Sequence, residues 1–105
     1  MKAPVRLTLV LPRAIEDELV DVLSGHPEWA RGLTLFHAQG HGRRDAELGA
    51  RERVRGRAER SAVDLVLDET HVEDLLALLR QRYAGADITW WCSPVLAFGS
   101  LHETS

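Results

Sequence analysis

The order of apolar patterns along the chain constrains its fold more than any other feature. A strand pattern, a helix pattern and a second strand pattern follow one another, and the same series returns after an interruption. The first series occupies residues 5–11, 12–24 and 33–41, and the second occupies residues 61–67, 68–84 and 87–92. The sequence therefore predicts two strand-helix-strand halves of similar length, joined by a long connection.

The spacing of apolar residues inside these ranges defines the fold class. Alternate residues from Val5 to Leu11 are apolar, as in a strand with one face in a core. Both helix patterns repeat apolar residues three or four positions apart, starting at Ile15 and at Val72. We expect an α+β fold of the ferredoxin-like βαββαβ type, with both helices on one face of an antiparallel four-stranded sheet. The 105 residues fit a single domain, residues 1–105.

The strands also carry apolar residues on the face that the helices leave open. Phe36, Val66 and either Trp90 or Trp91 fall on that second face. A large uncovered apolar face marks an association surface, so we expect an oligomer whose sheets pack toward a common axis. The tail, residues 95–101, is also apolar. We expect it to fold back on its own sheet or to cover a neighbouring chain.

A glycine hinge, Gly40-His41-Gly42, opens an arginine-rich segment (residues 43–60) between the two halves. That segment holds seven arginines and four acidic residues, a balance of +3, although the whole chain carries −3. We interpret it as a long loop that contacts an anion or an acidic partner, or else as a solvated loop with Arg/Glu pairs. The interleaved acids and the lack of aromatic residues argue against nucleic-acid binding.

Several sequence motifs and segments are absent, and their absence narrows the class of protein. The single cysteine, Cys92, cannot form an internal disulfide, and the N-terminal apolar run is too short for a secretory or membrane-spanning segment. We therefore expect a cytoplasmic protein that is not embedded in a membrane. No phosphate-binding loop motif, CxxC pair or supported Ser/His/Asp order is present, so the sequence does not predict an enzyme.

Several short motifs resemble the PII signal-transduction superfamily, and more closely a bacterial PII-like family of unassigned function. They are His-Pro-Glu at 26–28, Gly-His-Gly-Arg at 40–43, Val-Arg-Gly-Arg at 54–57 and Trp-x-x-Pro-Val-x-x-Phe-Gly at 91–99. Their order, together with the long connection between two strand-helix-strand halves, extends the resemblance over nearly the whole chain.

The resemblance implies a homotrimer that binds a small anionic ligand in clefts between subunits, at the base of the long loop. The ligand would be an adenine nucleotide or bicarbonate. The residues that it implies for the site are His37, Gln39, Gly40, His41, Gly42, Arg43 and Arg44. The loop, with Arg51, Arg53, Arg55 and Arg57, would then dock on a target protein such as a membrane transporter.

The sequence departs from the prototype PII pattern in three places. Arg44 replaces a glutamine that supports magnesium beside the nucleotide, and residues 82–90 contain no lysine for a phosphate loop. The one tyrosine, Tyr83, lies on the second helix rather than in the loop. These differences argue against magnesium-ATP binding and against uridylylation of the prototype kind.

A metal site is the alternative function. His37 and His41 share one strand face but lie about 13 Å apart along it, too far for one ion. A site that combines His37, His41 and Cys92 would need a bend at Gly40, a neighbouring strand or a second subunit. The trimeric divalent-cation-tolerance proteins are the structural rival, so the alternative is a metal-binding trimer involved in heavy-metal tolerance.

Overall fold

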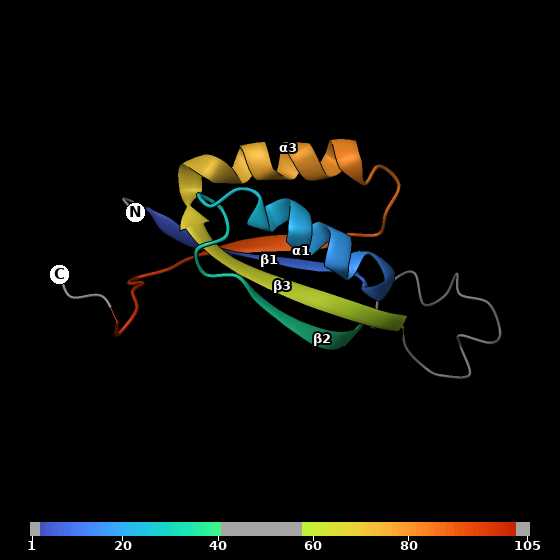
Figure 1. The fold of residues 1–105 in the computed structure, drawn as a ribbon, viewed down its shortest axis with the longest axis horizontal. Helices are drawn as coiled ribbons and strands as arrows, with labels where there is room; N and C mark the ends of the chain where they lie inside the picture. Colours follow the sequence, from blue (N-terminus) through green and yellow to red (C-terminus); the bar gives the residue numbers. More distant parts are fainter. Residues whose placement is uncertain (1–2, 41–57, 103–105) are drawn as a thin grey trace.

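The four strands form one antiparallel sheet (Figure 1). The computed structural model describes residues 3–40 and 58–102. The strands are β1 (Pro4–Pro12), β2 (Thr34–Gly40), β3 (Ala58–Asp68) and β4 (Thr89–Pro94), in the order β2-β3-β1-β4. β1 pairs with β3 and β4, and β2 pairs with β3. This arrangement confirms the predicted ferredoxin-like fold.

Both helices cover the same face of the sheet (Figure 1). A short 3₁₀ helix, η1 (Arg13–Ile15), leads into α1 (Glu16–Ser24), and η3 (Glu69–His71) leads into α3 (Val72–Arg82). Asp68 starts the second of these turns, because its side chain accepts a hydrogen bond of 3.0 Å from the Thr70 backbone nitrogen. The core beneath the helices consists mainly of fully buried leucines: Leu7, Leu9, Leu11, Leu19, Leu23, Leu65, Leu67 and Leu75.

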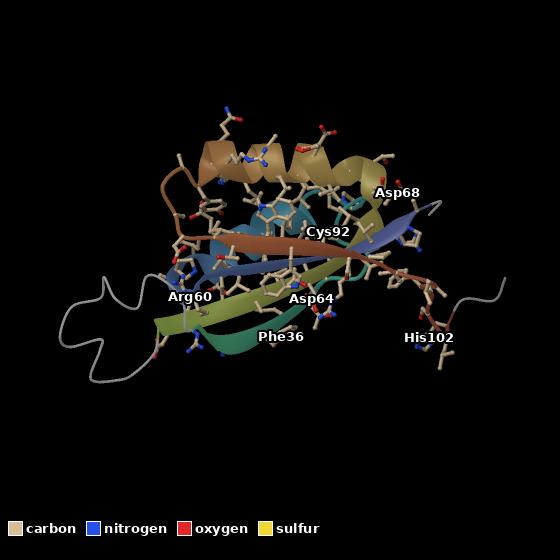
Figure 2. All side chains as sticks on the ribbon, turned by 180° about the vertical axis from the view of Figure 1, so that it is seen from behind. Phe36, Arg60, Asp64, Asp68, Cys92 and His102 are labelled. Atoms are coloured by element: carbon tan, nitrogen blue, oxygen red, sulfur yellow. The ribbon has the colours of Figure 1, made fainter. Side chains whose placement is uncertain are left out.

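No helix within residues 3–40 and 58–102 covers the opposite face of the sheet, as the sequence predicts. Phe36 and Asp64 lie on this side, away from the helices (Figure 2). The strand register pairs Trp91 with Thr8 on the uncovered face and Trp90 with Leu9 on the helix-covered face. Trp91 is therefore the tryptophan of the uncovered face, where it is 51% exposed and Phe36 is 44% exposed.

The tail folds back over its own chain at one point. Val95 donates a backbone hydrogen bond of 3.1 Å to Pro4. The Phe98 ring reaches the α1–β2 connection at Gly32, where a Cβ would lie 3.2 Å from the ring and 3.1 Å from Val66. Gly32 therefore permits Phe98 to pack there. Leu96 and Leu101 are fully exposed.

The observed bounds of β3 and β4 differ from the sequence expectation. β3 begins at Ala58, so residues 58–60 of the arginine-rich segment belong to the sheet rather than to a loop. β4 continues through Pro94, which the edge position of this strand allows because a proline there need not donate to a second neighbour. Within residues 3–40 and 58–102, no helix is long and apolar enough to cross a membrane.

Candidate functional site

A polar cluster lies at the β2 edge of the sheet, on the helix-covered side. Glu16, the first residue of α1, receives a hydrogen bond of 2.5 Å from the Ser61 hydroxyl. Its other carboxylate oxygen lies 3.2 Å from Nε2 of His37. Ser61 is fully buried and pairs with His37 across β2 and β3, so the register places these two side chains next to each other, and the start of α1 adds Glu16.

Hydrogen bonding favours the ionised form of Glu16 in this cluster. The hydrogen bond from Ser61, followed by that from His37, lowers the pKa of Glu16 below its ordinary value. An ionised carboxylate can only accept hydrogen bonds, so His37 must donate through Nε2. A neutral His37 then keeps Nδ1 as an acceptor or a ligand atom, and its side chain is 57% exposed. The cluster can therefore present to solvent the His37 imidazole, whose orientation is held by Glu16.

A second polar connection joins the start of β3 to the α3–β4 connection. The Arg60 guanidinium lies 2.5 Å from a carboxylate oxygen of Asp87 and donates a further bond of 3.3 Å to the Asp87 carbonyl. Arg13 donates a bond of 3.1 Å to the Arg60 carbonyl, which ties η1 to the same point. The Arg60 side chain is only 16% exposed. Arg60 therefore holds the start of β3 against the α3–β4 connection. Its place in a run of charged residues does not indicate this role.

The structure places three of the seven residues predicted to bind a ligand. His37 is in the middle of β2, whereas Gln39 and Gly40 end that strand and pair with Glu59 and Ala58. His41, Gly42, Arg43 and Arg44 lie outside the described residues, as do the four loop arginines Arg51, Arg53, Arg55 and Arg57. The structure adds Glu16 and Ser61 beside His37, two residues that the sequence pattern did not indicate.

The two described candidates for a metal site lie far apart within one chain. His37 is on β2 and Cys92 is on β4, the two opposite edges of the sheet. Three strand spacings of about 4.8 Å separate these edges by roughly 14 Å. Burial, and to a lesser extent the charge of Glu69, raises the pKa of Cys92 and so disfavours the thiolate that binds metals. No group of three metal-ligating side chains occurs in the described ranges, so a site with His37 and Cys92 requires a second chain.

The uncovered face has a polar centre between its aromatic residues. Asp64 accepts a hydrogen bond of 2.6 Å from the Thr8 hydroxyl and two bonds from Arg6, at 2.6 and 3.0 Å. Thr8 is buried, although no helix covers it. Phe36 and Trp91 leave apolar surface on the same face, which has the mixed character of an association surface.

Solved structures of PII-like proteins have a similar fold. CPII, a nitrogen regulatory PII-like protein from Thiomonas intermedia K12 bound to ADP, AMP and bicarbonate, superposes with a TM-score of 0.69 at 14% identity, over 94% of this chain and 97% of that one. A candidate PII-like signalling protein from Thermus thermophilus gives 0.61 at 19% identity, over 88% of this chain and 86% of that chain. The protein therefore has a PII-like fold.

The sequence assigns the chain to a family within that class. It belongs to the DUF3240 family, described as proteins of unknown function, whose profile matches residues 1–102. The structure of a DUF3240 family protein from Shewanella baltica OS155 has a TM-score of 0.76 at 21% identity, over 96% of this chain and 99% of that one. No curated protein matches this sequence. The resemblance to a PII-like family of unassigned function is confirmed.

Proposed function

We propose that this chain is a PII-like regulatory protein that binds a small anionic ligand between the subunits of a homotrimer. The ligand is an adenine nucleotide or bicarbonate. The observation that carries the proposal is the likeness of fold to CPII over almost the full length of both chains, since that protein was crystallised with ADP, AMP and bicarbonate.

The ligand site would combine the end of β2 with the residues that follow it. Its members are His37, Gln39, Gly40, His41, Gly42, Arg43 and Arg44. Glu16 would repel an anion at this edge, but its carboxylate is engaged by Ser61 and His37. The positive charge for the ligand would then come from Arg43 and Arg44, whose guanidinium groups suit phosphate and carboxylate oxygens.

Signalling would pass through the arginine-rich segment. Arg51, Arg53, Arg55 and Arg57 present positive charge to an acidic surface of a target protein, such as a membrane transporter. Ligand binding at the base of this segment changes the docking only if the ligand interacts differently with its docked and free conformations. Assembly into a trimer is supported by the exposed Phe36 and Trp91 on the uncovered face.

Calorimetry with AMP, ADP and bicarbonate tests the ligand site. We expect saturable binding of at least one of these anions, and at least about tenfold weaker binding in Arg43→Ala, because a hydrogen bond to a charged group is lost. Arg82→Ala is the matched control, since Arg82 lies on α3 in a pair with Glu18. Absence of binding by all three ligands to the intact oligomer would contradict the proposal.

The same preparation separates the metal alternative from the regulatory function. A metal-handling trimer would bind zinc or copper saturably and would bind neither a nucleotide nor bicarbonate. Its metal binding would be lost in both His37→Ala and Cys92→Ala. Light scattering reports the assembly in the same samples, and a monomer at micromolar concentration would contradict both functions.

A further inference from the structure

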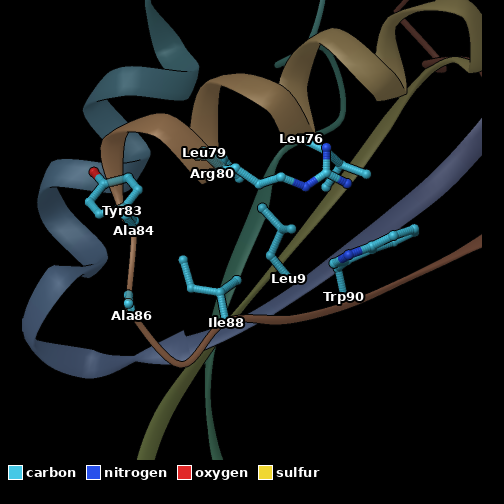
Figure 3. Close-up of a pocket in the computed structure, with 10 residues that line it drawn as sticks. Leu9, Leu76, Leu79, Arg80, Tyr83, Ala84, Ala86, Ile88 and Trp90 are labelled. Carbon is cyan, nitrogen blue, oxygen red and sulfur yellow. The ribbon is translucent and has the colours of Figure 1, made fainter.

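An apolar cavity lies between the C-terminal half of α3 and the β4 edge of the sheet (Figure 3). It has a volume of about 280 Å³. Its aliphatic lining comes from β1, α3 and the α3–β4 connection: Leu9, Leu76, Leu79 and Ile88. The cavity is on the helix-covered face but at the edge opposite to β2, so it is separate from the His37 cluster.

The α3–β4 connection leaves this space open because its residues are small. Ala84, Gly85 and Ala86 follow the helix in succession and all line the cavity. Gly85 has a φ of 86°, which glycine adopts without strain, and no atom lies within 4 Å of the place that a Cβ would take. A larger side chain at Ala84 or Ala86 would narrow the cavity.

An aromatic and a charged side chain border the cavity beside its aliphatic lining. The Trp90 indole borders the cavity and is 45% exposed, although it points to the helix-covered face. Arg80 extends from α3 over the cavity on the side where Trp90 lies (Figure 3). Its ion pair with Glu73 is long, at 4.0 Å, and both side chains are well exposed, so Arg80 can turn to another anion at little cost.

The volume and the lining define the class of ligand. An apolar cavity of roughly 150 Å³ holds one benzene ring, and sites for drug-sized molecules start at roughly 300 Å³. This cavity therefore has room for one ring with a short substituent rather than for a nucleotide. The exposed indole offers a surface for ring stacking, and the guanidinium at the mouth matches a carboxylate.

We propose that the α3–β4 cavity is a binding site for a small aromatic monocarboxylate, with the ring against Trp90 and the carboxylate on Arg80. This site is independent of the anion site at the end of β2. It requires neither the arginine-rich segment nor a nucleotide.

Titration of the ¹⁵N-labelled protein with phenylacetate tests the site through its three tryptophan indole signals. We expect a saturable shift of the Trp90 signal and a much smaller one for Trp91, which is on the other face of the sheet. The neutral isostere phenylacetamide should bind about tenfold more weakly, because the charged contact with Arg80 is lost. Acetate, which lacks the ring, should leave the Trp90 signal in place.

Two pairs of variants test whether phenylacetate binds in the α3–β4 cavity. Arg80→Gln should weaken phenylacetate binding about tenfold, whereas Arg82→Gln on the same helix should leave it unchanged. Ala86→Leu should abolish binding by filling the cavity, whereas Ala77→Leu, on the exposed side of α3, should not. Equal affinities within either pair would overturn the proposal.

Two further outcomes would also overturn it. Equal shifts of the Trp90 and Trp91 signals would mean that the probe binds without selecting this face. If removal of residues 95–105 moves the Trp90 signal and is required before phenylacetate binds, the tail of a second copy occupies the cavity instead. Folding of every variant is checked by the remaining backbone signals of β1 and β3.

Discussion

The two faces of the sheet differ in how far a single chain buries their side chains. Beneath the helices, Leu7, Val63 and Leu65 are completely buried within one chain. On the uncovered face, Thr8 and Ala62 are buried, but Phe36 and Trp91 remain about half exposed. Away from the α3–β4 cavity, the first face is therefore buried within a single chain, whereas the second offers apolar surface to another molecule.

The difference between the faces lies in the polar residues as well. Asp64, at the centre of the uncovered face, binds both Thr8 and Arg6. A charged residue with satisfied hydrogen bonds can sit at an interface, whereas it would be expensive in an aliphatic core. Side chains that alternate along one strand can therefore form the folding core on one face of the sheet and an assembly surface on the other.

The largest effect should come from a matched pair of valines on β3. Val63→Ala should lower the free energy of unfolding by about 2–3 kcal/mol, because two buried methyl groups are lost and a cavity remains. Val66→Ala, on the uncovered face, should cost about 1 kcal/mol or less. Urea denaturation at equal protein concentration measures both. Equal losses would mean that the second face is as well packed as the first.

The next effect concerns assembly rather than folding. Trp91→Glu should raise the concentration at which subunits dissociate by about 10- to 100-fold, equivalent to about 1.4–2.8 kcal/mol, because a charge enters an apolar contact. Trp91→Phe keeps an aromatic ring and should change dissociation much less. Light scattering over a dilution series gives the comparison. An unchanged oligomer in Trp91→Glu would show that this face is not the interface.

A smaller effect should follow from removing the centre of the polar network. Asp64→Ala should destabilise the fold by about 1–2 kcal/mol, because it leaves the hydroxyl of the buried Thr8 without its acceptor. Arg6→Ala removes only an exposed partner of the same carboxylate and should cost less than about 1 kcal/mol. Thermal unfolding distinguishes the two variants, and a reversed order would contradict the assigned role of Asp64.

The smallest effect is a dependence of stability on pH at the β2 edge. Because the folded-state pKa of Glu16 lies below its ordinary value of 4.5, its stabilisation is complete above that pH. It is lost as the pH falls through the folded-state pKa. Ser61→Ala removes the largest cause of the shift, so an NMR titration should show the pKa of Glu16 rising toward 4.5. An unchanged pKa would mean that Ser61 does not hold the carboxylate.

Much of the fold follows from local pattern. The apolar periods predict each strand and helix, and their order predicts the sheet topology. The start of β3 was not predicted, because Glu59 and Arg60 look like members of a charged loop. Arg60 is held in the strand region by Asp87, 27 residues away in the sequence. Such a tertiary pair leaves no periodic signal.

The candidate site was less predictable than the fold. His37 was expected to bind a ligand, but its partners Glu16 and Ser61 are 21 and 24 residues away. Glu16 resembles any acidic residue in the first turn of a helix, and Ser61 resembles any small residue at the start of a strand. The register of β2 on β3 brings Ser61 to His37, and the packing of α1 on the sheet brings Glu16 to both. The α3–β4 cavity has a sequence signal, the run Ala84-Gly85-Ala86, but nothing in that run shows which side chains border the space.

The Arg60–Asp87 pair connects the two regions that we propose to bind ligands. It joins the start of β3, where the arginine-rich segment ends, to the connection whose neighbouring residues line the α3–β4 cavity. The two sites are coupled if a ligand near the end of β2 strengthens or breaks this pair and the pair in turn changes the affinity of the cavity for its ligand. Reciprocity then requires an occupant of the cavity to change the affinity for that ligand by the same factor. A double-mutant cycle on Arg60 and Asp87, followed in both titrations, would measure this coupling.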